Sequence, residues 1–194
     1  GGGRRTTSAA IAIVNLDSQI AGIEELAGRR ALTVAERVNL ADLRLQRGQI
    51  LGCISDYEVA TAIGEALVTE APDDGRSWLV RARARATWHR FDQALADLGA
   101  AERRGVATSE TDGPRAAILQ ATGRYDEALV VRRRMVAARA DAATLGGEAV
   151  LRAVRGELGD AERLFAGALA RHRDGSPFPI AWIDFQRGLM WMRE

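Results

Sequence analysis

Apolar residues recur along the chain at the spacing of an α-helix. In the first long segment, Ile13, Leu16 and Ile20 follow one another at three- and four-residue intervals, which places their side chains on one face of a helix. This pattern predicts an amphipathic helix that ends near Gly28. Alanine, leucine, arginine and glutamate, which all favour helices, fill most of the remaining chain, and only 4 prolines interrupt it. Alternation of apolar and polar residues with a period of two is scarce, so the sequence predicts an all-α protein.

A short pattern, an aromatic residue followed three positions later by alanine, repeats along the chain. It occurs at Tyr57–Ala60, Phe91–Ala94 and Tyr125–Ala128, and a looser copy occurs at Leu158–Ala161. The successive alanines are 34, 34 and 33 residues apart. Each copy follows a turn-forming stretch and predicts the start of the second helix of a hairpin. The small alanine allows the two helices to lie close together, while the aromatic ring fills the angle between them.

This helix-turn-helix unit resembles the tetratricopeptide repeat (TPR), whose period is also about 34 residues. Segment 75–108 matches the family pattern best: Trp78 stands at its tryptophan site, Ala82 at its small-residue site, and Phe91 and Ala94 follow the turn. The resemblance implies a right-handed αα-superhelical solenoid of stacked hairpins, with a concave groove lined by the first helix of each hairpin.

The period divides the chain into seven segments. These are a flexible leader at 1–7, an N-terminal helical cap at 8–40, four TPR-like repeats at 41–74, 75–108, 109–141 and 142–180, and the first helix of an incomplete further repeat at 181–194.

The chain departs from the family pattern at one position of every repeat. The residue just before the small site, usually leucine in the family, is charged here: Arg47, Arg81, Arg115, Glu148 and Arg187. Either these side chains loosen the packing of the first helices, or their aliphatic stems cover the helix surface while their charged heads reach water.

Three further places disturb the pattern. Gly113 and Pro114 stand where the first helix of the third repeat should be starting, which predicts a short or late helix, because the residue before a proline avoids the helical conformation. Loop 171–179 lengthens the spacing before the last helix, and we expect the array to bend there. His89 occupies a turn position at which glycine is usual, so we interpret it as a polar turn residue.

Composition and charge exclude several functions. The 194 residues include 27 basic and 26 acidic side chains, a balance that does not favour a nucleic-acid-coating protein. Every basic residue is arginine, so lysine Schiff-base chemistry and a P-loop lysine are absent. A single cysteine, Cys53, and two histidines make a zinc or other metal site improbable, and we expect Cys53 to be a buried, inert thiol. No paired nucleophile and base stand out, so the sequence predicts a protein that is not an enzyme and uses no cofactor.

The aromatic residues and the arginine run have structural interpretations. We expect the repeat aromatics to pack in the core rather than to stack on a ligand: Tyr57, Trp78, Trp88, Phe91 and Tyr125. The run Arg132–Arg134 does not favour nucleic-acid binding, because successive residues on a helix point in different directions and no aromatic platform accompanies them.

The resemblance also implies a set of groove residues on the first helices of the repeats. Carried over from peptide-binding members, these are Asp42, Leu45, Gln49, Arg76, Leu79, Arg83, Thr87 and Gln120, with further positions at Cys53, Glu110, Ala117, Val150 and Val154. Arg76 and Arg83 are two helical turns apart with Leu79 between them, so both could receive an acidic peptide, or both could form a solvated face. The lysine and asparagine residues of the carboxylate-clamp members are missing, which disfavours a chaperone C-terminal tail as the ligand.

The last helix carries apolar residues nearly all round and should therefore be covered on both sides. Cover could come from sequence beyond this chain or from a second copy, and we assign self-association to Trp182, Phe185, Leu189 and Trp191.

We therefore expect a non-enzymatic protein–protein interaction module that presents a concave groove to a peptide or partner segment. The alternatives are a dimerisation element that uses the last helix, or a regulatory fragment of a longer multidomain protein. No apolar run reaches the 18 residues of a membrane span. The first residue is glycine rather than methionine, which indicates a processed or engineered terminus and leaves both a cytoplasmic protein and a tethered envelope domain open.

Overall fold

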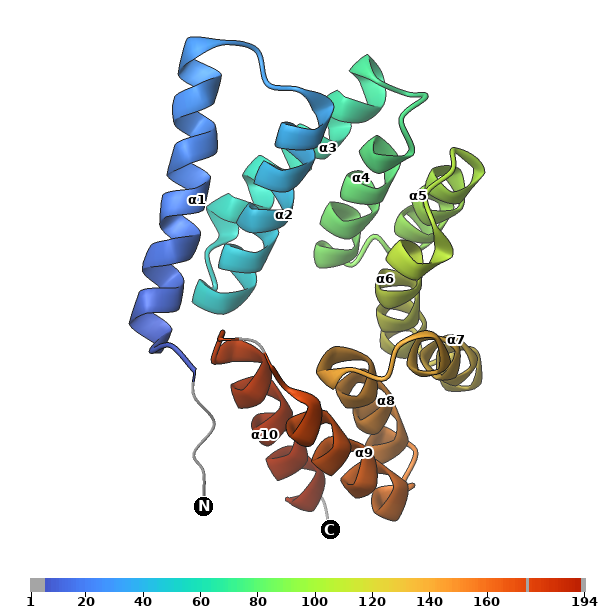
Figure 1. The fold of residues 1–194 in the computed structure, drawn as a ribbon. Coiled ribbons are helices and arrows are strands. Elements are labelled where there is room, and N and C mark those ends of the chain that lie inside the picture. Colours follow the sequence, from blue (N-terminus) through green and yellow to red (C-terminus); the bar gives the residue numbers. More distant parts are fainter. Residues whose placement is uncertain (1–5, 174, 193–194) are drawn as a thin grey trace. The chain divides into compact units, whose positions relative to one another are not determined.

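The computed structural model describes residues 6–173 and 175–192, and within them the chain forms ten helices and no strand (Figure 1). The helices are α1 (Ala9–Arg29), α2 (Val34–Leu51), α3 (Ile54–Glu70), α4 (Gly75–Thr87), α5 (Phe91–Arg103), α6 (Thr108–Ala121), α7 (Tyr125–Ala138), α8 (Ala142–Val154), α9 (Leu158–Arg171) and α10 (Phe178–Trp191). The prediction of an all-α chain of helix hairpins is confirmed. Helix α2 begins inside the segment that the period assigned to the N-terminal cap, and most of the predicted leader lies outside the described residues.

Three helices, α2, α4 and α8, begin at a capping side chain that the sequence supplies. Thr33 accepts a hydrogen bond from the backbone amide of Glu36, and the Glu36 carboxylate accepts one from the amide of Thr33. Hydrogen bonds from Arg30 and then from Thr33 lower the pKa of Glu36 to about 2, so this carboxylate stays charged. Asp141 caps α8 with the same reciprocal pair of hydrogen bonds, made with Thr144, whereas Asp74 caps α4 by accepting from the amide of Arg76. A side-chain cap contributes about 1 kcal/mol to helix stability.

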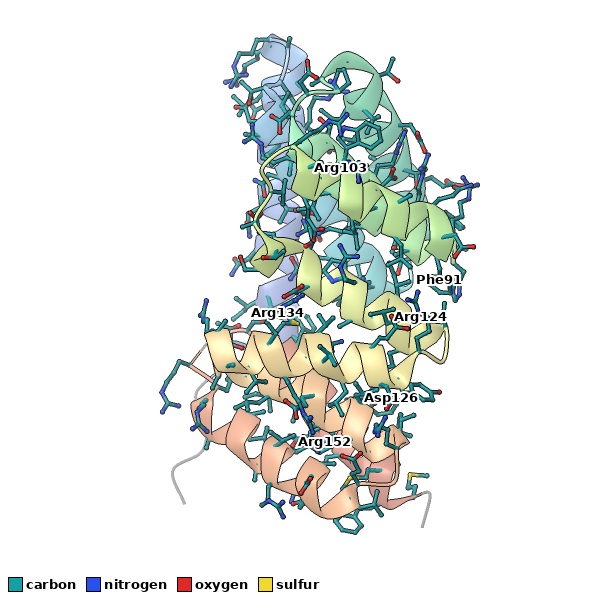
Figure 2. The ribbon with its side chains drawn as sticks, turned by 90° about the vertical axis from the view of Figure 1, so that its right-hand side faces the viewer. Phe91, Arg103, Arg124, Asp126, Arg134 and Arg152 are labelled. Carbon is teal, nitrogen blue, oxygen red and sulfur yellow. The ribbon has the colours of Figure 1, made fainter. Side chains whose placement is uncertain are left out.

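The turns within the hairpins share one backbone conformation. Gly52, Gly123 and Gly156 have φ values of 68°, 76° and 79°. At the corresponding turn of the α4–α5 hairpin stands His89, with a φ of 57°, the one non-glycine with positive φ in the described chain. His89 is thus the turn residue that the sequence predicted. Figure 2 shows Phe91 at the start of α5, directly after this turn.

The repeating alanines bring the helices of each hairpin together. Ala60, Ala94, Ala128 and Ala161 are all fully buried, as the aromatic-x-x-Ala pattern predicted. In the first hairpin the approach is closer still, because the Tyr57 ring lies so near the Gly48 backbone that a Cβ atom there would collide with it. Packing at these positions fixes the spacing between the two helices of a hairpin.

The helices form two compact units, whose boundaries fall inside α1 and α6. The N-terminal unit comprises residues 13–114, and the C-terminal unit joins residues 115–194 to the beginning of the chain. Within the C-terminal unit, the amide of Thr7 donates a hydrogen bond to the carbonyl of Gly175 at 2.7 Å.

Each unit has its own apolar core. That of the N-terminal unit includes the buried residues Leu16, Ile20, Leu40, Leu67 and Val80. That of the C-terminal unit includes Ala149, Leu151, Phe165, Ala168 and Ile183.

The expectation of a short or late helix at Gly113 and Pro114 is wrong. Helix α6 runs unbroken from Thr108 with Pro114 inside it. Its first turns are held by Thr111, which is fully buried and whose hydroxyl donates a hydrogen bond to Glu102 on α5. The buried contacts of this turn therefore stabilise the helix by more than the missing backbone hydrogen bond of the proline costs.

The expectation that all repeat aromatics lie in the core is also wrong. Trp88 is exposed at the end of α4, although its indole N–H donates to the Thr61 hydroxyl at 2.9 Å and its ring meets Tyr57 edge-on. Tyr125 is exposed at the start of α7. Both rings sit at helix ends next to turns, where no further helix covers them.

Replacing His89 by glycine should stabilise the protein. A side chain in the left-handed conformation costs about 1 kcal/mol, so we expect the free energy of unfolding of His89→Gly to rise by up to about that amount in urea titrations. The matched change, Gly123→Ala, should lower it by about the same amount. A loss of stability in His89→Gly would show instead that the contact of the His89 ring with Phe91, at 5.2 Å between centroids, outweighs the backbone strain.

Candidate functional site

Arginine–carboxylate pairs join the two helices of the hairpins, beginning with α2 and α3. Asp56 on α3 is 0% exposed and accepts two hydrogen bonds from the Arg47 guanidinium, at 2.8 Å from Nε and 2.6 Å from Nη2. Arg44 donates a third at 2.7 Å. Such bidentate charge-assisted bonds are among the strongest in proteins. The hydrogen bonds from Arg47 and Arg44 hold the pKa of Asp56 below its ordinary value, despite the burial of this carboxyl.

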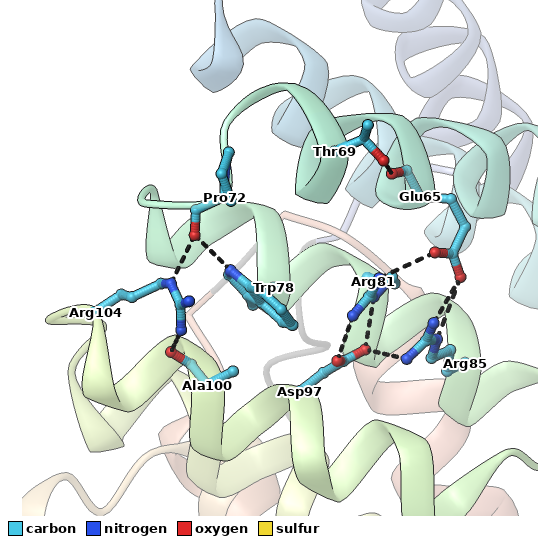
Figure 3. Close-up of polar contacts among 9 residues, drawn as sticks. All are labelled: Glu65, Thr69, Pro72, Trp78, Arg81, Arg85, Asp97, Ala100 and Arg104. Atoms are coloured by element: carbon cyan, nitrogen blue, oxygen red, sulfur yellow. Dashed lines mark hydrogen bonds and ion pairs between the residues drawn. The ribbon is translucent and has the colours of Figure 1, made fainter.

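The same arrangement recurs one repeat later, between α4 and α5 (Figure 3). Arg81 donates to both carboxylate oxygens of Asp97, at 2.9 and 2.8 Å, and Arg85 donates to one of them at 2.9 Å. Glu65 on α3 accepts from Arg81 at 3.1 Å and from Arg85 at 2.9 Å. Two arginines and two carboxylates thus connect three successive helices.

Trp78, at the family's tryptophan site, is held by the same group of side chains. Its indole N–H donates to the Pro72 carbonyl at 2.7 Å, and Arg104 donates to that carbonyl at 2.6 Å (Figure 3). The guanidinium carbons of Arg81 and Arg104 lie 4.8 and 4.5 Å from its ring centroid. These cation–π contacts and hydrogen bonds fix the connection between α3 and α4.

The C-terminal unit repeats the arrangement with other side chains. Arg152 on α8 donates to Glu148 and Glu157 at 2.7 Å and to Asp160 on α9 at 3.0 Å. Arg187 on α10 donates to Glu162 on α9. Arg47 and Arg81 therefore do not send their heads into water, which was one of our expectations for the charged positions before the small sites. Their length lets them cross to the neighbouring helix, where Asp56 and Asp97 replace water as partners, whereas Glu148 pairs with Arg152 of its own helix.

The predicted groove arginines of the N-terminal unit already have carboxylate partners. Arg76 donates to its own helix cap, Asp74, at 2.6 Å. Arg83 donates to both oxygens of Asp42, at 2.9 and 2.8 Å. A ligand carboxylate at either arginine would have to displace an internal ion pair.

The other predicted groove residues of this unit differ in exposure. Leu45 and Leu79 are buried in the core, whereas Gln49 is exposed. Thr87 is half-buried and donates its hydroxyl proton to the Arg83 carbonyl at 3.1 Å. Cys53 precedes α3 and is half-buried, with its Sγ atom 3.1 Å from the Ser55 hydroxyl, so it is less buried than we had expected.

A cleft of about 540 Å³ lies within the C-terminal unit. Its lining comes from α6, α7, α8 and α10: Ala117, Gln120, Ala121, Tyr125, Arg132, Gly147, Val150, Val154, Trp182, Gln186 and Leu189. The structure thus brings Gln120 together with three further groove positions of the third and fourth repeats, Ala117, Val150 and Val154. It also adds Tyr125, which we had assigned to the core.

Arg132 is a charged cleft residue that the sequence analysis did not mark as a binding residue. Its side chain lies against α8 at Gly147, where an added Cβ atom would stand 2.6 Å from Nη1. Its Nε atom is buried without a hydrogen-bond partner, and the side chain forms no hydrogen bond or ion pair with any residue that the structure describes. Burial lowers the pKa of this guanidinium below its ordinary value. Gly147, in the interior of the facing helix α8, was the one sequence signal that a side chain approaches this helix closely.

Helix α10 is covered on one face only. Ile183 and Met190 are buried, but Trp182, Phe185 and Trp191 are 43%, 61% and 48% exposed. The described residues do not cover the other face, for which we expected cover from sequence beyond this chain or from a second copy.

The described residues hold no group of three or more histidine, cysteine or acidic side chains that could bind a metal ion. None of their helices is both long and apolar enough to cross a bilayer.

Comparison with solved structures identifies the fold. A thermophilic TPR protein of Thermus thermophilus, TTC0263, aligns with a TM-score of 0.74 at 18% identity over 94% of both chains. The chain has the tetratricopeptide-repeat fold. MamA aligns with a TM-score of 0.55 at 12% identity, over 82% of this chain and 90% of MamA. YrrB, a TPR protein described as having an unusual peptide-binding site, aligns with a TM-score of 0.52 at 15% identity, over 92% of this chain and 84% of YrrB.

Sequence comparison adds no relative. No protein-family model and no curated protein matches the chain. The predicted resemblance to the TPR fold is therefore confirmed at the level of structure.

Asp56→Asn should weaken the TPR hairpin α2–α3. The variant leaves two buried arginines without this carboxylate, so we expect the free energy of unfolding at pH 7 to fall by about 2–4 kcal/mol. Because the folded-state pKa of Asp56 lies below its unfolded value of about 3.9, its contribution is present above that pH and is lost as pH falls through the folded value. The parent should therefore lose more stability than the variant in urea titrations between about pH 4 and pH 2.

Glu25→Gln is the matched control, because Glu25 forms an ion pair with Arg29 at the surface, where both side chains are exposed. It should change stability by less than about 1 kcal/mol. Equal effects of the two substitutions would contradict a special role for the buried pair.

Proposed function

We propose that the chain is a non-enzymatic protein-interaction module that binds an extended peptide segment in the cleft of the C-terminal unit. The observation that carries this proposal is the composition of that cleft. Gln120, Val150 and Val154 stand at positions that line the groove in peptide-binding TPR proteins, and the cleft of about 540 Å³ contains all three. A mixed lining of apolar side chains and a few polar groups is typical of ligand sites.

The fold supports the same proposal. Stacked helical repeats present the surface of their first helices to partners, and specificity comes from the side chains on that surface. A peptide-binding site is described for YrrB, which shares the fold. In the N-terminal unit, Arg76 and Arg83 would bind an acidic segment only where it displaces Asp74 or Asp42 from them.

Selection of peptides from a random display library, followed by fluorescence anisotropy, tests this function. We expect Val154→Asp to weaken binding of the selected peptides at least about tenfold, or about 1.4 kcal/mol, because it places a carboxylate in the apolar part of the cleft. The matched control is Val130→Asp, which changes a more exposed valine on α7 outside the cleft and should leave the affinity unchanged.

Two results would contradict the proposal. One is a library that yields no peptide binding above that of an unrelated folded protein. The other is an affinity that falls in Arg83→Glu but not in Val154→Asp, which would place the binding surface on the N-terminal unit.

A second function, self-association through α10, is favoured by the aromatic residues exposed on this helix. Under this alternative proposal Phe185 and Trp191 are covered by a second copy of the chain, with Trp182 and Leu189 at the edge of that contact. Burial of such large rings would supply much of the association energy.

Light scattering over a range of concentrations tests the alternative. We expect a self-associating parent to gain mass with concentration and Phe185→Asp to remain a folded monomer, because Phe185 is exposed and lies outside the cleft lining. Val130→Asp again serves as the control and should behave as the parent does. A parent that is monomeric at every concentration would exclude this function and leave peptide binding untouched.

A further inference from the structure

We propose that Arg132 is the anion-binding group of the cleft and that the cleft recognises a carboxylate next to an apolar side chain. The inference rests on the proposed function and deepens it, since it names the chemical class of the peptide segment.

The first step is the contrast between Arg132 and the other buried arginines. Arg47, Arg81 and Arg152 also have largely buried side chains, and each donates to at least two carboxylates at distances between 2.6 and 3.1 Å. Arg132 donates to none among the described residues. A buried charge without a partner is costly, and an apolar side chain of similar volume would serve the fold better. The guanidinium is therefore poorly explained by stability alone.

The second step is the space that α8 provides for it. A side chain at position 147 would place its Cβ atom 2.6 Å from Nη1 and 3.0 Å from Cζ of Arg132, so the guanidinium keeps its present position only because residue 147 is glycine. Glycine inside a helix is less favourable than any residue except proline. Two unfavourable choices, the glycine and the unpaired arginine, thus meet at one point of the cleft. Coincident breaches of local stability rules are expected at functional sites.

The third step is the chemistry of the lining. A guanidinium is a planar fork that matches a carboxylate with two parallel hydrogen bonds. Val150, Val154 and Leu189 supply apolar surface in the same cleft, and Gln120 and Gln186 supply amide groups. Arg132 is the single cation in this lining, so it balances one negative charge. A doubly charged phosphate group would leave its second charge unpaired beside apolar side chains, and a carboxylate would not.

Small probes can test this recognition without a known ligand. We would record ¹H–¹⁵N NMR spectra, including the arginine Nε–H signals, while adding N-acetyl-leucine, N-acetyl-leucinamide or the α-amide of N-acetylglutamic acid. The first carries a terminal carboxylate, the second has none, and the third carries a side-chain carboxylate. We expect N-acetyl-leucine to bind with a dissociation constant on the order of 1 mM and to shift the signals of Arg132 Nε–H, Gly147 and Val150.

The carboxylate and the arginine should both be required. N-acetyl-leucinamide should bind at least tenfold more weakly than N-acetyl-leucine, and Arg132→Gln should weaken N-acetyl-leucine by a similar factor. Arg133→Gln removes the same charge from the next, exposed position of α7 and should have no effect. Saturable binding of the α-amide of N-acetylglutamic acid would show that the cleft accepts the carboxylate of a peptide side chain. If this probe does not bind and N-acetyl-leucine does, the cleft recognises the carboxylate at a peptide C-terminus. Equal binding of acid and leucinamide, or equal binding by parent and Arg132→Gln, would overturn the proposal.

Stability provides a second, independent measurement. If Arg132 serves binding rather than folding, Arg132→Met should unfold at a urea concentration equal to or above that of the parent. A clearly lower midpoint would assign Arg132 a structural role and overturn the proposal. Peptides whose binding depends on Val154 but not on Arg132 would likewise refute the carboxylate site while leaving the peptide-binding function in place.

Discussion

The bidentate pairing of an arginine on one helix with a carboxylate on the next is the interaction on which the hairpins α2–α3 and α4–α5 depend. The small residues at their contacts, such as Ala60 and Ala94, allow close approach but bury little apolar surface of their own. The arginine stem supplies additional packing, and the guanidinium joins two helices through hydrogen bonds to a largely buried carboxylate. Asp56 and Asp97 can be buried only because arginines meet them in this way. The absence of lysine from the sequence fits this role, because an ammonium group lacks the planar fork.

The sequence predicted the fold well because the repeat signals are local. A buried alanine after each turn, a left-handed residue within it and helix-forming residues on both sides specify a hairpin without reference to the rest of the chain. His89 illustrates this: its place in the period identified it as a turn residue, although its type did not. The prediction failed at Pro114, because buried contacts of Thr111 in the preceding turn hold α6 together, and such tertiary contacts leave no local signal.

The candidate site was predictable only in part, for a related reason. Gln120, Val150 and Val154 followed from repeat positions, and the structure places them in one cleft. Whether an arginine is paired depends on which carboxylates face it, and that is not evident from composition or spacing. Arg76 and Arg83 could have received a ligand on the sequence alone and are paired, whereas Arg132, considered only as part of the run Arg132–Arg134, is largely buried.

The largely buried arginines of this protein therefore fall into two classes. Both have the same side-chain chemistry, and they differ in what the neighbouring helix presents to the guanidinium. Where a carboxylate lies on the next helix, the guanidinium stabilises the fold and is saturated, and a ligand would gain little by competing for it. Where the next helix presents glycine, as Gly147 does to Arg132, the guanidinium keeps its hydrogen-bonding capacity in a site of reduced solvation. Electrostatic attraction to an incoming carboxylate is stronger there than at the surface, because less water screens it. Pairing thus separates the arginines that hold the repeats together from the one best placed to bind an anionic ligand.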